Sequence, residues 1–273
     1  MIYEEIPVKT KGSLEYAKLQ MYILDTPGES IGLKIKRRPM IFICPGGGYY
    51  KTSYREGEPI AMYFLNKGFH ACVLRYSVAP ARFPVQLEEI DYAIKVILEK
   101  ADEWKIDINY LFLHGASAGG HLVASYCALY GTDWVKSFVK LTGILLSYPV
   151  VTSDERFIHR GSFENLLGDA YEAKKDNLSI EKIVTEKMPP TFIWHTEEDQ
   201  TVPVKNSLLL TEALEKLGVS VELHLFPKGE HGLSLANELV EREDGSGIQK
   251  DCACWIELAY TWIANQIKKE NES

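Results

Sequence analysis

The sequence has little that would support a disulfide framework or a membrane span. It contains five cysteines, which form no CxxC pair and lack the density of a disulfide scaffold, so we expect free thiols in a reducing compartment. No uninterrupted apolar run approaches the roughly 18 residues of a membrane span. The N-terminus, Met1–Glu5, has no positive segment followed by an apolar stretch. These absences predict a soluble protein of the cytoplasm, with no membrane partner.

Basic charge is also in short supply. Lys and Arg total 30 against 38 Asp and Glu, which gives a net charge of −8. An acidic surface repels phosphate backbones, so nucleic-acid binding would need a local basic patch. The densest candidate, Lys34 to Arg38, ends at a proline and a buried-looking strand, and we interpret it as a solvated turn. No nucleic-acid partner is expected.

Length and composition indicate one globular domain. The chain has 273 residues, with 46% hydrophobic and 25% charged residues, which excludes general disorder. No Gly/Ser/Pro-rich linker divides it, and single α/β domains often reach this size. We therefore predict a single domain over residues 1–273. The oligomeric state is not readable from the sequence.

Apolar runs of strand length alternate with segments of helical period, which is typical of a mostly parallel sheet flanked by helices. The N-terminal segments Ile2–Val8 and Leu19–Leu24 alternate in polarity and predict an antiparallel start to a sheet of about eight strands. The other expected strands are Met40–Cys44, His70–Tyr76, Leu111–His114, Thr142–Tyr148, Thr191–His195 and Val221–Phe226. The expected helices are Pro59–Asn66, Val85–Trp104, Ala118–Tyr130, Lys205–Leu217 and Cys252–Ile267.

One stretch breaks this rhythm. Residues 151–190 are polar, end at Pro189-Pro190 and are long for a bare connection. We interpret them as a small inserted cap.

A serine lies between an expected strand and an expected helix, in His114-Gly-Ala-Ser117-Ala-Gly-Gly120. The G-x-S-x-G string alone is a weak signal, but the strand-to-helix context is that of a nucleophile elbow. There a serine occupies a strained turn, and small neighbours at Gly115 and Gly119 leave room for it. The helix that follows directs its N-terminal amides at the site, which favours negative charge. A glycine-rich turn without chemistry is the alternative.

A second glycine cluster, Pro45-Gly46-Gly47-Gly48-Tyr49, directly follows the Met40–Cys44 strand. Consecutive glycines let backbone N–H groups approach a ligand closely. We predict an oxyanion hole formed by Gly47 or Gly48 together with Ala118, the residue after the serine. A phosphate-binding loop is disfavoured because the Gly-Lys-Ser/Thr end of a P-loop is missing. A purely structural turn stays open.

A serine nucleophile needs a neutral imidazole, and the imidazole needs an acceptor that fixes its tautomer. His231 follows the last expected strand and Asp199 follows the Thr191–His195 strand. Both positions, like Ser117, are strand C-terminal ends, where α/β sheets place ligands. We interpret four other histidines as structural residues of the strands: His70, His114, His195 and His224. His121, one helical turn past the serine, is a candidate for the pocket floor, and His159 lies in the expected cap. No metal-binding spacing occurs, so we expect neither metal nor cofactor.

Together these anchors resemble the α/β-hydrolase superfamily over nearly the whole chain, from Met40 to Trp262. The segments Pro45–Tyr49, Arg75–Pro80 and Gly115–Leu122 are similar to bacterial acetyl-esterase and xylan-esterase-like carboxylesterases. The resemblance implies hydrolysis of short acyl esters, such as acetyl groups on a sugar. The chain departs from the hormone-sensitive-lipase branch, which has His at position 45, Asp at position 116 and a long N-terminal cap.

The leading hypothesis is therefore a cofactor-free serine carboxylesterase that acts on a small-molecule ester through an acyl-enzyme. Ser117 is the expected nucleophile, His231 the base, and Asp199 the residue that orients His231. An arylformamidase-like amide hydrolase would use the same machinery. A non-catalytic binding protein of this fold is the alternative from another class, disfavoured because all three residue types occur at the expected stations.

Overall fold

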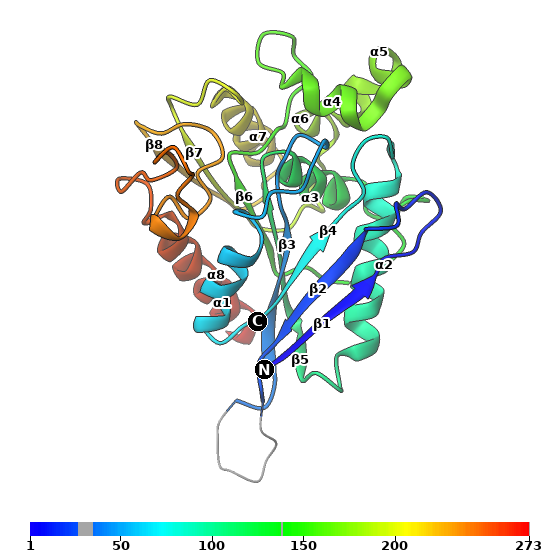
Figure 1. Cartoon of the computed structure of the whole chain (residues 1–273), viewed down its shortest axis with the longest axis vertical. Coiled ribbons are helices and arrows are strands. Elements are labelled where there is room, and N and C mark those ends of the chain that lie inside the picture. Colours follow the sequence, from blue (N-terminus) through cyan, green and yellow to red (C-terminus); the bar gives the residue numbers. More distant parts are fainter. Residues whose placement is uncertain (27–34, 138, 273) are drawn as a thin grey trace.

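The computed structural model describes residues 1–26, 35–137 and 139–272 and shows one central sheet with helices on both faces (Figure 1). Lys34, the first residue of the basic run considered above, lies outside the described residues. The eight strands occur in the order β1-β2-β4-β3-β5-β6-β7-β8. Their bounds are β1 Ile2–Pro7, β2 Lys18–Ile23, β3 Arg38–Cys44, β4 His70–Arg75, β5 Ile106–Ala116, β6 Gly143–Ser147, β7 Thr191–Thr196 and β8 Val221–Phe226.

The sheet is antiparallel at one edge and parallel elsewhere. β1 pairs antiparallel with β2, and β2 pairs antiparallel with β4. All remaining pairs, from β4–β3 to β7–β8, are parallel. The predicted mostly parallel sheet of about eight strands with an antiparallel start is confirmed.

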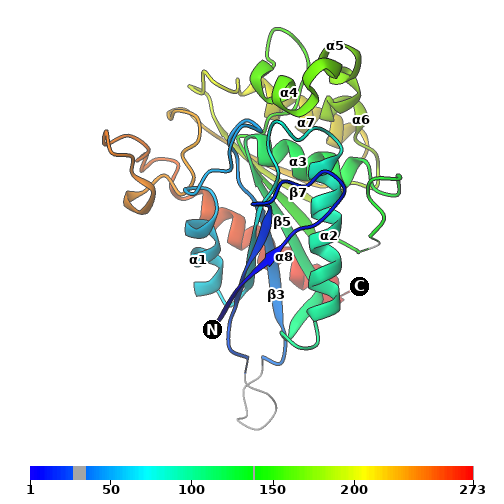
Figure 2. The ribbon, with the colours of Figure 1, turned by 45° about the vertical axis from the view of Figure 1, so that its right-hand side comes forward.

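The helices form two layers (Figures 1 and 2). Helices α1 and α8 lie on one face, while α2, α3 and α7 lie on the other. Their bounds are α1 Glu58–Asn66, α2 Val85–Lys100, α3 Ala118–Ala128, α7 Lys205–Lys216 and α8 Trp255–Glu272. Short helices follow β6: α4 Arg160–Leu167, α5 Tyr171–Lys174 and α6 Ile180–Ile183.

Strand alternation explains the two layers. In β3, Met40 and Phe42 belong to the cluster that packs on α2 and α3, whereas Ile41 and Ile43 belong to the cluster that packs on α1 and α8. Successive strand residues point to opposite faces, so an apolar strand buried on both sides reads as a continuous apolar run. This is why the central strands could be found from sequence.

Several helix ends differ from the prediction. The expected helix Val85–Trp104 ends at Lys100, and Trp104 instead packs in the core at 3% exposure. The amide of Ala101 donates to Leu98 and that of Trp104 to Lys100, which turns the chain into β5. Likewise α3 ends at Ala128 and α8 begins at Trp255, three residues after the expected start.

All five cysteines are free, and only Cys254 is exposed. None of the helices in the described ranges combines the length and apolar character that a bilayer crossing requires.

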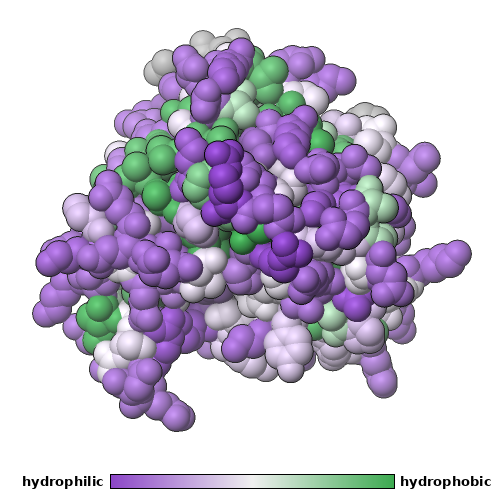
Figure 3. All heavy atoms as spheres, turned by 90° about the horizontal axis from the view of Figure 1, so that it is seen from above, coloured by the Kyte–Doolittle hydropathy of each residue, from purple (hydrophilic) through white to green (hydrophobic). Residues whose placement is uncertain are grey.

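The C-terminal ends of the parallel strands meet at one end of the molecule, beneath α4, α5 and α6 (Figure 1). Viewed onto this end, hydrophilic residues cover most of the surface and hydrophobic residues gather in one part of it (Figure 3). This end carries the site described next.

Candidate active site

Ser117 lies at a sharp turn between β5 and α3. Its backbone angles, φ 51° and ψ −119°, are ones that side-chain-bearing residues rarely adopt. The turn is possible because two neighbours lack a side chain. A Cβ on Gly115 would lie 2.3 Å from the Gly119 carbonyl oxygen, and one on Gly119 would lie 2.0 Å from that of Cys44. The glycines therefore let α3 pack directly against β3, and this packing holds the strained serine in place.

The three residues predicted to form the triad are in hydrogen-bond contact. His231 Nε2 lies 2.8 Å from Ser117 Oγ, and His231 Nδ1 lies 2.6 Å from Asp199 Oδ2. Asp199 follows β7 and His231 follows β8, two neighbouring strands on the same side of β5 in the sheet. With Nδ1–H donated to the carboxylate, Nε2 is free to accept the serine proton.

Asp199 is held as a carboxylate. Its Oδ1 accepts the backbone amides of Thr201 and Val202, each at 2.9 Å. Its Oδ2 accepts His231 and, at 3.2 Å, His195 Nε2. Burial opposes the charge, but the hydrogen bonds from His195 and His231 outweigh it and keep the pKa of Asp199 well below its ordinary value. The carboxylate therefore stays ionised throughout the neutral range.

His195 was expected to be a structural strand residue, and the structure places it against the triad. Its Nε2 also lies 2.9 Å from the Val202 carbonyl, which can only accept, so Nε2 carries the proton. Nδ1 then accepts the hydroxyl of Ser207 at 2.7 Å. Its position four residues before Asp199 was visible in the sequence, but the direction of the ring was not.

The glycine loop after β3 reaches the serine. A Cβ on Gly46 would lie 2.9 Å from Ser117 Cβ, so the loop backbone rests on Ser117. Gly47 and Gly48 have positive φ angles of 126° and 65°. No described residue accepts the amide of Gly47 or of Gly48. Ala118 opens α3, so its amide also lacks an intrahelical acceptor.

A buried histidine anchors this loop. His121 Nδ1 lies 2.9 Å from the Tyr49 hydroxyl, and its Nε2 lies 2.8 Å from the Leu178 carbonyl. Burial lowers the pKa of His121 to about 4, so the ring is neutral. Rather than forming an open pocket floor, His121 ties the glycine loop to the segment between β6 and β7.

The segment between β6 and β7, expected as a cap, covers the other side of the glycine loop. Asn165 on α4 donates from Nδ2 to the Gly48 carbonyl at 2.9 Å. The atoms nearest to a Cβ placed on Gly48 are His159 Cε1, at 3.7 Å, and Ser162 Oγ, at 3.8 Å. Burial, followed by the neighbouring His231, lowers the pKa of His159. The three groups that contact the loop here, on α4 and at its N-cap His159, are therefore polar and uncharged.

The remaining histidines lie elsewhere. His70 contacts the Leu24 amide, His114 the Ser147 hydroxyl, and His224 the Glu222 carboxylate. Within the described parts of the chain, His, Cys, Asp and Glu side chains form no group of three that could hold a metal ion. The arrangement that remains is a hydroxyl, an imidazole and a carboxylate joined by hydrogen bonds, with the glycine loop resting on Ser117.

Comparisons with known proteins show what the chain is similar to. Residues 33–214 match the BD-FAE family. The chain is 36% identical over 215 residues to endo-1,4-beta-xylanase B of Butyrivibrio fibrisolvens, covering 74% of this chain and 33% of that protein. It is 29% identical over 196 residues to the acetylxylan esterase of Xylanibacter ruminicola, covering 69% and 39%. It thus spans between a third and two fifths of the length of these curated relatives.

A solved structure resembles nearly the whole chain. The acetyl ester-xyloside bifunctional hydrolase of Caldicellulosiruptor lactoaceticus superposes with a TM-score of 0.76 at 36% identity. The match covers 91% of this chain and 88% of that one.

Proposed function

This chain belongs to the BD-FAE family and has the α/β-hydrolase fold, and from that premise we propose that it is a serine carboxylesterase acting on short acyl esters. The observation that carries the proposal is the chain of hydrogen bonds from Ser117 through His231 to Asp199. Acetyl esters of a sugar or a similar small alcohol are the proposed substrates, supported by the acetyl-ester chemistry named in two of the relatives.

The proposed reaction has two halves. Ser117 Oγ attacks the ester carbonyl while His231 Nε2 takes the hydroxyl proton, and the resulting tetrahedral oxyanion accepts the amides of Ala118 and of Gly47 or Gly48. The imidazolium then gives its proton to the leaving alcohol as the ester C–O bond breaks. In the second half, water gives a proton to His231 as it attacks the acyl carbonyl, and His231 then returns this proton to Ser117 Oγ as the acyl C–Oγ bond breaks and the acid is released.

The direct test combines turnover with labelling. The wild type should hydrolyse p-nitrophenyl acetate, and a fluorophosphonate should add one phosphonyl group, located on Ser117 by mass spectrometry. Ser117→Ala should lose labelling and about 10⁶-fold in kcat while its Tm stays close to wild type. More than about a hundredth of the activity left in Ser117→Ala would remove this residue from the mechanism. Faster turnover of N-formylkynurenine than of acetate esters would favour an arylformamidase.

The location in the cytoplasm and the lack of a nucleic-acid or membrane partner stay predictions.

A further inference from the structure

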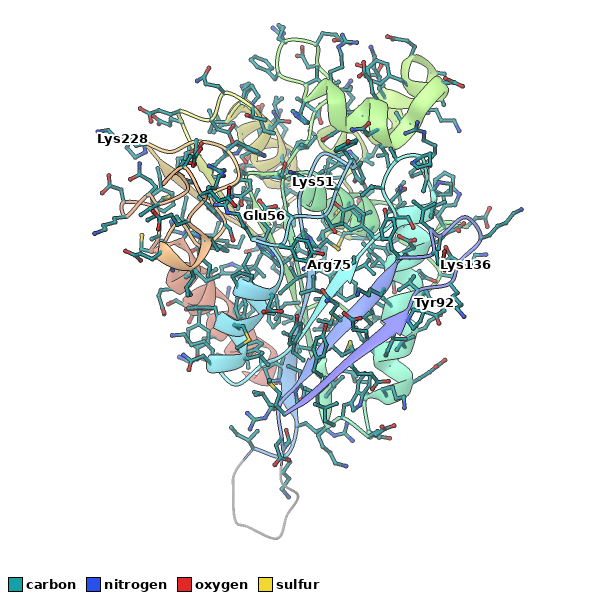
Figure 4. The ribbon with its side chains drawn as sticks, in the orientation of Figure 1. Lys51, Glu56, Arg75, Tyr92, Lys136 and Lys228 are labelled. Carbon is teal, nitrogen blue, oxygen red and sulfur yellow. The ribbon has the colours of Figure 1, made fainter. Side chains whose placement is uncertain are left out.

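A buried carboxylate that the proposed reaction does not use lies beneath the site. Glu56 is 3% exposed and lies in the loop that follows the glycine loop, near the middle of the molecule and beside the stretch that carries Lys51 (Figure 4). A buried charged side chain is costly unless each oxygen is satisfied. The partners of its two oxygens therefore show what this residue is for.

One oxygen holds the glycine loop. Glu56 Oε2 accepts the backbone amide of Gly46 at 2.9 Å. Gly46 is the residue whose backbone rests on Ser117, and the amides of Gly47 and Gly48 follow it directly. Fixing the Gly46 peptide therefore sets the direction of the amides proposed to bind the oxyanion.

The other oxygen holds the histidine loop. Glu56 Oε1 accepts the hydroxyl of Tyr148 at 2.7 Å, and that hydroxyl accepts the amide of Ser234 at 2.8 Å. The Tyr148 ring meets the His231 ring edge-on, with centroids 5.0 Å apart. Glu56 Oε1 is also 3.9 Å from a Cβ placed on Gly232, the residue after His231. Tyr148 thus connects Glu56 to the His231 ring and to the backbone at Ser234.

The neighbouring residue strengthens the same connection. Arg55 Nη1 donates to the Gly232 carbonyl at 2.9 Å, and its Nε donates to the Val240 carbonyl at 2.6 Å. The Ser234 hydroxyl donates back to the Arg55 carbonyl. Residues 55 and 56 therefore contact the histidine loop through separate groups, while Glu56 alone also reaches the glycine loop.

The hydrogen-bond pattern requires acceptors at both oxygens of Glu56. The Gly46 amide can only donate, and the Tyr148 hydroxyl has its proton free for Glu56 because it already accepts from Ser234. Glutamine has nearly the same shape but offers one acceptor and one donor. It can satisfy either Gly46 or Tyr148, but not both.

We propose that Glu56 is a positioning residue that sets the oxyanion loop and the His231 loop relative to each other. This inference rests on the proposed esterase activity and adds to it a group that touches neither substrate nor the reacting atoms. Its effect should appear in kcat, because the geometry it holds matters most in the transition state.

The test compares Glu56→Gln with Glu58→Gln. Glu58 is the control because it also accepts a tyrosine hydroxyl, that of Tyr22 at 2.9 Å. Unlike Glu56, it is exposed and has no hydrogen bond to a described residue of the site. On p-nitrophenyl acetate, we expect Glu56→Gln to lower kcat about 10- to 100-fold with KM within about threefold, and Glu58→Gln to change neither. Affinity for a trifluoromethyl ketone, which forms a tetrahedral oxyanion on Ser117, should fall in parallel with kcat.

A double-mutant cycle separates positioning from general damage. Tyr148→Phe removes the second partner, so the glutamine in Glu56→Gln/Tyr148→Phe needs to satisfy only Gly46. The loss in the double variant should therefore be clearly smaller than the product of the single losses. Multiplicative losses, or an unchanged kcat in Glu56→Gln, would overturn the proposal while leaving the esterase activity itself in place.

A measurement without substrate tests whether Glu56 holds the glycine loop. Amide hydrogen exchange of the peptide over residues 46–54 should speed up in Glu56→Gln and not in Glu58→Gln. Unchanged exchange would show that Glu56 does not hold the glycine loop. This readout stands even if the wild type hydrolyses no ester, an outcome that would refute the proposed function instead.

Discussion

Among single residues, Asp199 keeps its negative charge far into the acid range. The pKa of Asp199 lies well below its ordinary value, so its contribution to stability is present above the unfolded pKa and is lost only as pH falls far into the acid range. An ordinary imidazole, in contrast, titrates at about pH 6.5. The acid side of the activity profile should therefore report the base alone.

We accordingly expect kcat/KM to fall tenfold per pH unit on the acid side, with a slope of one proton. A slope of two would mean that Asp199 titrates in the same range. The measurement is kcat/KM for p-nitrophenyl acetate in buffers of constant ionic strength. A profile that stays flat down to about pH 5 would count against His231 as the base.

His195 should matter for rate because it holds the oxygen of Asp199 that also accepts His231. A hydrogen bond to a charged group contributes about 1.5–3 kcal/mol, so His195→Ala should lower kcat roughly 10- to 100-fold. His114→Ala is the control, because His114 is equally buried but bonds to Ser147. Both variants should lose stability through a cavity, and only His195→Ala should lose kcat. Equal kcat in the two variants would make His195 purely structural.

Among the elements, the glycine loop offers a pair of contrasting positions. A Cβ on Gly47 would lie 2.2 Å from the Lys51 carbonyl oxygen at φ 126°, whereas one on Gly48 meets nothing closer than 3.7 Å. Gly47→Ala must therefore move the loop and should lower kcat about 10²- to 10³-fold, comparable to losing an oxyanion donor. Gly48→Ala costs only a left-handed alanine, about 1 kcal/mol, and should keep activity within about tenfold. Similar losses in both variants would contradict this distinction.

The segment carrying α4, α5 and α6 should limit acyl length. Where it faces the glycine loop it presents His159, Ser162 and Asn165, which give a long acyl chain no apolar wall. Each buried CH₂ would otherwise contribute about 0.8 kcal/mol. We expect kcat/KM on p-nitrophenyl esters to peak at about two to four acyl carbons and drop at least about tenfold by eight. A maximum at eight carbons or beyond, or activation at a lipid interface, would show that the segment builds an apolar tunnel.

At the scale of the whole molecule, buried neutral histidines should set acid stability. Burial lowers the pKa of His70 and His121 to about 4 and that of His114 to about 3. Between about pH 6.5 and 4.5 the unfolded chain therefore binds up to three protons at these histidines that the folded chain does not, and His159, whose pKa burial also lowers, acts in the same direction. The free energy of unfolding falls as pH falls, by about 1.4 kcal/mol per pH unit for each proton that only the unfolded chain binds. Burial raises the pKa of Glu89, which opposes this by at most one proton.

The expected slope is thus about 3–4 kcal/mol per pH unit, measured by urea unfolding at pH 6.5, 5.5 and 4.5. His114→Asn should reduce this slope by about 1.4 kcal/mol per pH unit, the contribution of one proton. A free energy of unfolding that stays constant over this range would contradict the neutral buried state of these histidines.

The sequence by itself determined the sheet, the strand-to-helix turn at Ser117, and which three side chains (Ser117, Asp199 and His231) the structure brings into hydrogen-bond contact. A doubly buried strand such as β3 reads as a continuous apolar run from Met40 to Cys44, and a serine between glycines at a strand-to-helix junction has few other uses. These are local constraints, so they leave a local pattern. The end of α2 leaves no such local pattern, because Trp104 continues the apolar spacing of the helix but packs in the core beyond it.

Only the tertiary structure decided how the parts of the site are held together. Glu56, Tyr148 and His195 are separated along the chain, and each meets the site through side-chain atoms, from the segments after β3 and β6 and from β7 itself. No periodicity or spacing records such contacts, because a buried polar side chain is satisfied by whichever donors the fold brings beside it. The reacting groups follow from strand ends and glycine turns, whereas their positioning depends on distances that exist only once the sheet is assembled.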